Sequence, residues 1–265
     1  MLPGRARRRA IVSLIVFVVL WEVGARSKTW FGVTVPWIGH VPAPSGALRV
    51  WVGLLHDPGY WQSWGVSLVR VIGGFGAAML VGIPFGLALA SSRVVHQLAF
   101  PVFEVLRPIP PLAWVPAAII FWPTPELSIG FVTFIGAFFT IVINVVGGAR
   151  SIDARYYQAA RAMGASRWNL FRRIVLPATL PSIAIGAAVG MGITWEVVVA
   201  AEMISGGGSS GASGGGLGFF IWNSYVGGAY EQIIIGMISI GIAGYACSAA
   251  LRWLGTRLTP WLRRR

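Results

Sequence analysis

Six long stretches of the sequence are nearly free of charged residues, and this pattern limits the possible folds more than any other feature. A helix needs about 20 mainly apolar residues to cross the hydrocarbon core of a membrane. The sequence therefore predicts an all-α, polytopic membrane protein with about six transmembrane helices, of which the first and third are short. The stretches are residues 11–25, 71–92, 108–125, 127–149, 180–205 and 232–251, and only Glu22, Glu196 and Glu202 interrupt them.

The basic residues indicate which side of the membrane each segment faces. The chain has 21 Lys and Arg residues against 8 Asp and Glu residues, a net charge of +13, and such a charge can also indicate nucleic-acid binding. Most of the arginines, however, fall in segments 5–9, 93–107, 150–173 and 252–265, which share one side if the chain crosses the membrane six times. Cytoplasmic loops carry such an excess. We therefore expect both termini in the cytoplasm, a lipid membrane around the chain and no nucleic-acid partner.

A secretory signal peptide is the alternative interpretation of the N-terminus. Segment 5–9 is basic, residues 11–21 are apolar, and Val23-Gly24-Ala25 loosely resembles a cleavage site. The neighbouring Glu22 and the apolar character of the remaining chain favour a first helix that stays in the protein.

The sequence lacks the motifs of enzymes that act within membranes. A P-loop requires a glycine before its lysine, whereas Ser27 precedes Lys28, which is the only lysine in the chain. The three histidines are scattered, none precedes a glutamate, and none lies within a predicted span, so neither a zinc protease nor a serine hydrolase is favoured. A single cysteine, Cys247, can form no intramolecular disulfide. We expect no catalytic residue, no metal site and no cofactor bound by this chain.

The segment between the fourth and fifth stretches predicts two short helices joined by a glycine turn. Asp153 can cap the first helix at its N-terminus, and Gly164 can end it in the left-handed conformation. Ser166 can cap the second helix, which we expect to end near Pro177. Since small side chains let the groove of another protein approach a helix closely, we expect the alanines of the first helix to be presented outward among its arginines.

This segment resembles the coupling motif of ABC importer permeases, E-A-A-x3-G-x9-I-x-L-P. The sequence reads Gln158-Ala159-Ala160, then Gly164, Ile174 and Leu176-Pro177, so only the first fixed position differs, where Gln replaces Glu. The amide keeps the hydrogen-bonding capacity of that position but loses its charge. Segments 107–116, 201–204, 216–222 and 236–244 are similar to a subgroup that includes permeases for nitrate, bicarbonate, taurine and other sulfonates.

The resemblance extends over most of the chain, roughly from Trp61 to Trp261, and implies the type I permease fold of ABC importers. It implies one domain, residues 1–265, with a first span at 10–25, a five-span core at 61–254 and a cytoplasmic coupling loop at 153–177. In such importers of the bacterial inner membrane, two permease subunits, here expected as a homodimer, sit on two ATPase subunits that hold ATP and Mg²⁺. An extracytoplasmic binding protein delivers the solute, which then passes by alternating access. The motif predicts these ATPase-contacting residues: Tyr157, Gln158, Ala159, Ala160, Gly164 and Ala165.

Polar residues within the apolar stretches are the second group of candidates. A charge at the bilayer centre costs about 2.5–3.5 kcal/mol on insertion scales, so such residues usually face a cavity or a partner. Arg70 can pair with Glu22 or Glu202 near the outer end of the spans, either as an outer gate or as a static ion pair that fixes helix packing. Asn144 and Glu196 are further candidates for the translocation pathway.

A stand-alone secondary carrier or channel is the alternative function. Carriers often contain broken helices, and Pro84 and the prolines of 108–116 could interrupt helices here. The glycine-serine run at 206–216 is predicted as a flexible loop on the outer side.

Overall fold

The fold is seen in a computed structural model, which describes residues 4–204 and 215–261. Within these ranges the chain forms helices and no β-strand. Most of the run at 206–216 lies outside the described residues. The helices are α1 (Gly4–Ala25), α2 (Ser27–Phe31), η1 (Ile38–His40), α3 (Pro44–Leu54), α4 (Pro58–Ser91), α5 (Arg93–Leu106), η2 (Pro111–Trp114), α6 (Val115–Phe121), α7 (Pro125–Arg150), α8 (Ala154–Ala162), α9 (Arg167–Leu170), η3 (Phe171–Val175), α10 (Leu176–Ile204), α11 (Leu217–Val226) and α12 (Tyr230–Leu258).

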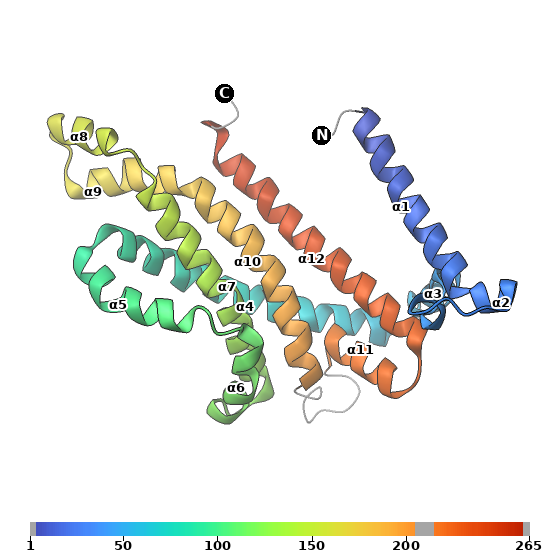
Figure 1. The fold of residues 1–265 in the computed structure, drawn as a ribbon. Helices are drawn as coiled ribbons and strands as arrows, with labels where there is room; N and C mark the ends of the chain where they lie inside the picture. Colours follow the sequence, from blue (N-terminus) through green and yellow to red (C-terminus); the bar gives the residue numbers. More distant parts are fainter. Residues whose placement is uncertain (1–3, 205–214, 262–265) are drawn as a thin grey trace.

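Helix α7 forms the centre of the bundle, and α4 and α10 pack against it over most of their length (Figure 1). Glycines allow both helices to approach closely. A Cβ atom on Gly86 of α4 would lie 2.8 Å from the side chain of Val145, and one on Gly186 of α10 would lie 2.7 Å from that of Asn144. Small residues at helix interfaces have this effect in membrane bundles.

Within the residues that the structure describes, four helices are long and apolar enough to cross a membrane. They are α4, α7, the continuous helix from Arg167 to Ile204, and α12, and the apolar part of α1, Ile11–Ala25, is shorter. The expectation of one continuous third helix over 108–125 is wrong. There, α5 and the η2–α6 segment form a pair bent by 91°, because proline removes a backbone donor and disfavours helical conformation in the residue before it. Counting the bent pair as one span gives five.

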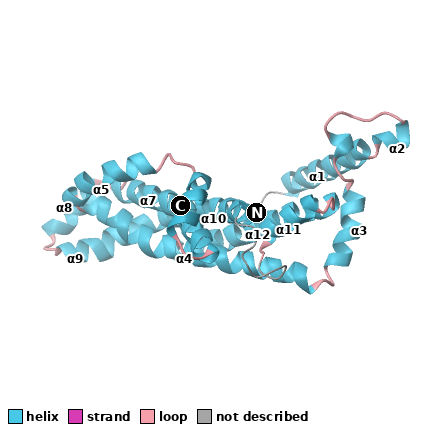
Figure 2. Cartoon of the chain, turned by 90° about the horizontal axis from the view of Figure 1, so that it is seen from below, coloured by secondary structure: helices cyan, strands magenta, loops and turns pink. Residues whose placement is uncertain are grey.

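The two ends of the described chain lie on the same side of the bundle. Figure 1 shows the start of α1, the end of α12 and the α8–α9 turn at the top, and the end of α10 at the bottom. Helix α1 sits with α2 and α3 at one end of the molecule (Figure 2). It packs chiefly on α2, η1 and α3, and its apolar residues from Ile11 to Leu20 are exposed.

Candidate functional site

Local capping shapes the loop between α7 and α10, as the sequence predicts. The Asp153 carboxylate accepts a hydrogen bond from the backbone N–H of Arg155 at 2.9 Å, and Ser166 Oγ accepts one from the N–H of Asn169 at 3.3 Å. Gly164 has a φ of +76°, a conformation that costs other L-residues roughly 1–2 kcal/mol. The chain therefore reverses between α8 and α9 at a residue suited to that turn.

The second helix does not end near Pro177 as expected. From Ser166 the backbone passes through α9 and the π-helical turn η3 directly into α10, so Arg167–Ile204 is one continuous helix. Pro177 lies within this continuous helix, two residues after the π-helical turn, so its missing N–H interrupts the hydrogen-bond ladder without ending the helix. The loop is thus joined rigidly to a long apolar helix.

The burial of α8 separates its predicted contact residues into two groups. Gln158, Ala159 and Gly164 are exposed, whereas Tyr157 and Ala165 are half-buried. Ala160 is only 6% exposed, so the expectation that both alanines are presented outward is wrong for Ala160. Helical geometry explains the difference, because neighbouring residues lie about 100° apart around a helix and α8 must turn one face toward the bundle.

Three large side chains on this surface were missed by the sequence reasoning. Tyr156, Met163 and Trp168 are 63%, 81% and 65% exposed, and we use the name outer loop face for these three residues and the exposed Gln158 and Ala159. Large exposed apolar side chains often mark protein interaction sites. Their signal in the sequence is weak, because a tyrosine, a methionine and a tryptophan in a helical loop are more often core residues.

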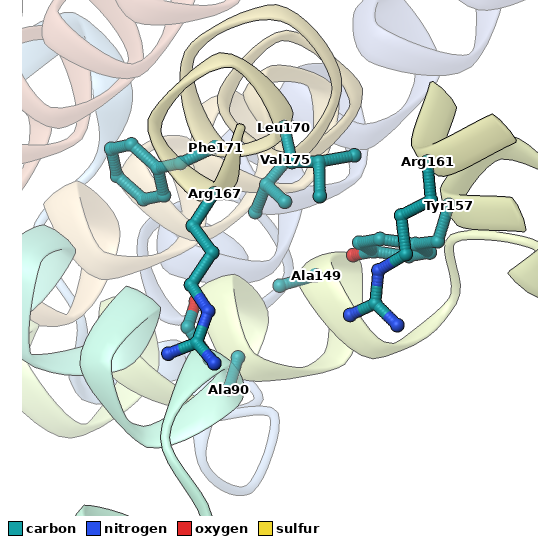
Figure 3. Close-up of a pocket in the computed structure, with 9 residues that line it drawn as sticks. Ala90, Ala149, Tyr157, Arg161, Arg167, Leu170, Phe171 and Val175 are labelled. Atoms are coloured by element: carbon teal, nitrogen blue, oxygen red, sulfur yellow. The ribbon is translucent and has the colours of Figure 1, made fainter. Parts of the chain in front are cut away.

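A cavity of about 440 Å³ lies between α8, α9, η3 and the ends of α4 and α7 (Figure 3). We call it the loop cavity. Its polar lining residues are Ser91, Tyr157, Arg161 and Arg167, and its remaining walls are apolar. Burial raises the pKa of the Tyr157 hydroxyl, because desolvation disfavours the phenolate.

Arg70 is at the centre of a buried ion cluster at the other end of the bundle. Its Nη1 lies 2.9 Å from Oε1 of Glu202, and its guanidinium also pairs with Glu126 of α7. Ser67 Oγ lies 2.8 and 2.9 Å from the two carboxylate oxygens of Glu202. The side chain of Glu202 is fully buried, while that of Glu126 is 63% exposed.

The same cluster supplies the hydrogen bonds that the N-terminus of α11 lacks. The N–H of Leu217 donates to Ser67 Oγ at 2.8 Å, and the N–H of Gly218 donates to Glu202 Oε2 at 2.9 Å. The first N–H groups of a helix have no partner within the helix and favour negative charge. The Glu202 carboxylate therefore compensates both the charge of Arg70 and the partial positive charge at the N-terminus of α11.

The other predicted pathway residues lie apart from this cluster. Glu22 pairs with Arg26 at 2.6 Å and accepts hydrogen bonds from Ser45, which joins α1 to α3, so it is not the partner of Arg70. Asn144 Nδ2 donates to the carbonyl of Thr140 in its own helix at 2.8 Å. Glu196 is exposed on α10.

Of the Arg70 cluster, sequence reasoning identified the pair with Glu202 but not Ser67 or Glu126. Glu126 is in the first turn of α7, where an acidic residue is ordinarily a solvated dipole partner. Ser67 carries no charge, and only the tertiary structure brings it to Glu202. Among the described residues, no three His, Cys, Asp or Glu side chains lie together in a way that could hold a metal ion.

Comparisons of the sequence and of the fold with known proteins all find membrane transport proteins. Residues 82–264 match the family described as binding-protein-dependent transport system inner membrane component. The nitrate import permease protein NrtB of Synechocystis sp. is 34% identical over 261 residues, covering 95% of this chain and 89% of the relative. The taurine transport system permease protein TauC of Escherichia coli is 30% identical over 259 residues, with 95% and 89% covered. A solved bacterial ABC transporter involved in the import of the acidic polysaccharide alginate has the same fold, with a TM-score of 0.62 over 96% of this chain and 97% of that chain at 17% identity.

Proposed function

Because the chain belongs to the family of binding-protein-dependent transport system inner membrane components, we propose that it is the permease subunit of an ATP-driven importer for a small anion of the nitrate or sulfonate class. A binding protein on the outer side delivers the solute, and alternating access passes it to the cytoplasm. The substrate class rests on the solutes after which the nitrate and taurine permeases, 34% and 30% identical to this chain, are named.

The outer loop face is the observation that carries the coupling part of this proposal. Tyr156, Met163 and Trp168 are exposed, as are Gln158 and Ala159, on a loop joined without a break to α10. An ATPase subunit, which holds ATP and Mg²⁺, presses on this face and moves α10 as a rigid lever. Tyr157, Ala160 and Ala165 then support the surface from within, and Gly164 sets its turn.

The arrangement of the helices supports a particular orientation and assembly. The α8–α9 turn lies on the same side as the start of α1 and the end of α12 (Figure 1), so an ATPase at the loop places both termini in the cytoplasm. The exposed apolar residues of α1 and the exposed face of α10 suit contact with a second copy and with lipid.

The ion pairs reduce an electrostatic objection to an anionic solute. Unpaired carboxylates in a pathway would repel an anion, but Glu22 is paired with Arg26 and Glu202 with Arg70, so of the three glutamates predicted for the pathway only Glu196 is without an ion pair among the described residues. We assign the Arg70 cluster to an outer gate that holds α4, α7, α10 and α11 together. Glu196, which is exposed on α10, and Asn144 are assigned to the pathway between two copies of the chain.

Gly164 allows a direct test of coupling. Nothing lies within 4 Å of where its Cβ would be, so a substitution acts through the backbone and not through a clash. We expect Gly164→Val to reduce substrate-stimulated ATP hydrolysis to its basal rate in reconstituted vesicles, whereas Gly164→Asn, which tolerates the left-handed conformation, retains most of it.

The control is co-purification with the ATPase. Wild type and Gly164→Asn should retain the ATPase on an affinity column, and a stand-alone carrier or channel would retain none. Stimulation that is equal in Gly164→Val and wild type would contradict the lever mechanism.

A further inference from the structure

We propose that the loop cavity binds a phosphate-like oxyanion, either as a free inorganic ion or as the phosphodiester of an anionic lipid headgroup. The cavity is separate from the outer loop face to which the ATPase was assigned. This proposal concerns a second ligand and does not depend on which solute the chain transports.

The charges around the cavity favour an anion. Arg161 of α8 and Arg167 of α9 both line it, and Figure 3 shows their side chains on either side of Ala149. Within the described residues neither guanidinium is paired with a carboxylate, since the acid of this loop, Asp153, caps α8 and lies 3.7 Å from Arg155. Two guanidinium groups that share one cavity repel each other, and an oxyanion accepting hydrogen bonds from both would remove that repulsion.

The walls of the cavity provide space and further donors. Small side chains at Ala90 and Ala149 leave room where two helices end, and the volume of about 440 Å³ is in the range of ligand pockets. The hydroxyl of Tyr157 points toward Ala149 in Figure 3. Like any tyrosine hydroxyl with an ordinary or raised pKa, it is protonated at neutral pH, so it can donate a hydrogen bond to an anion. Ser91 adds a second hydroxyl to the lining.

A bound oxyanion would add a connection between three helices that meet at the cavity. Arg161 lies before the Gly164 turn and Arg167 after it, and Ser91 is the last residue of α4. An ion held by these three elements would fix the angle of α8 relative to the bundle. The site would therefore control how stiffly the outer loop face is held.

Thermal unfolding of the full-length permease in uncharged detergent tests the proposal. Sodium phosphate is titrated against sodium chloride at equal ionic strength. We expect a saturable rise in Tm for wild type. Loss of one charged hydrogen-bonding partner should weaken the apparent Kd of phosphate about tenfold or more in Arg161→Gln and in Arg167→Gln.

Two further variants make the result specific. Arg172→Gln removes the same charge from an exposed arginine that does not line the cavity, and its apparent Kd should stay within about twofold of wild type. Ala90→Leu narrows the cavity without changing any charge and should weaken the phosphate effect, which keeps the test decisive if an arginine variant fails to fold. No saturable rise in wild type, or an equal rise in Arg161→Gln, Arg167→Gln and Ala90→Leu, would overturn the proposal.

Nanodiscs distinguish the two sources of the anion. In phosphatidylcholine discs the phosphate titration should repeat the detergent result. If discs containing phosphatidylglycerol stabilise wild type but not Arg161→Gln, and phosphate then adds nothing, the ligand is a lipid headgroup. If phosphate acts with the same Kd in both discs, the ligand is a free ion. If neither phosphate nor phosphatidylglycerol gives a stabilisation that is lost in Arg161→Gln and Arg167→Gln, the proposed site is wrong.

Discussion

Replacing Arg70 with glutamine should destabilise the protein far more than an ordinary polar substitution would. The Arg70 side chain is 6% exposed and that of its partner Glu202 is fully buried. Arg70→Gln would leave the Glu202 carboxylate without its cation, although Ser67 and the N–H of Gly218 would still donate to it. Removing one partner of a buried ion pair typically costs about 3–5 kcal/mol of unfolding free energy, and we expect a loss in this range.

Glu126 is the matched control because it contacts the same guanidinium. Its side chain is 63% exposed, so water screens its part of the interaction, and the Arg70 cation that remains keeps Glu202 as its partner. Exposed ion pairs contribute about 0–1 kcal/mol, and Glu126→Gln should cost no more than that. Comparing the unfolding free energies of the two variants therefore shows how much of the stabilisation depends on burial of the ion pair.

Equilibrium unfolding in mixed micelles of a mild detergent and dodecyl sulfate, followed by the fluorescence of the 13 tryptophans, measures these differences. The double variant Arg70→Gln/Glu202→Gln completes a thermodynamic cycle, and we expect a coupling energy of about 2 kcal/mol, within the range for contacting residues. Additive effects of Arg70→Gln and Glu202→Gln, or a cost for Glu126→Gln equal to that of Arg70→Gln, would refute the assignment of a buried pair.

Two other predictions follow from packing and from proton binding. Gly86→Ala should lower the free energy of unfolding by about 1–3 kcal/mol, because the added methyl group overpacks against Val145. The control is Gly76→Ala on the same helix, which has open space around its Cβ and should leave the stability unchanged or slightly raised. Equal Tm values for the two variants would contradict the close approach of α4 to α7. Burial raises the pKa of Tyr157 in the folded protein, so as pH rises this residue loses its proton in the unfolded chain before it does in the folded one. The stability of the protein should therefore fall as pH rises above about 10. Tyr157→Phe should show a smaller fall in Tm between pH 9 and 11 than wild type does.

The features that the sequence predicts well are those that depend on local chemistry. Helical spans follow from runs of apolar residues, and the ends of α8 and α9 follow from Asp153, Gly164 and Ser166, which act on backbone groups within a few residues of themselves. The pairing of Arg70 with Glu202 was one of two options, since a charge in an apolar stretch needs a partner nearby at the same depth. The other option failed because Glu22 already has Arg26 one helical turn away.

The features that the sequence does not predict depend on contacts between distant segments. The partner of Ser67 is 135 residues away, and nothing in the neighbourhood of either residue marks the other. The inward position of Ala160 likewise depends on where α8 lies relative to α4 and α7, not on its own side chain. The prolines at 108–111 do signal a break, but the 91° angle between α5 and the next segment is set by packing on both sides of it.

The N-terminus of α11 shows how one glutamate ties several of these distant contacts together. Gly216 precedes this helix, and any side chain there would meet Glu202 and Ser67, so a glycine is required for the close approach. The approach in turn allows Leu217 and Gly218 to donate to the cluster. An outward movement of α11 would therefore expose the carboxylate of Glu202 and leave two N–H groups without partners at once. Because these costs arise together, the outer end of the bundle is expected to change between two discrete arrangements and not to deform gradually, which is the behaviour that an outer gate requires.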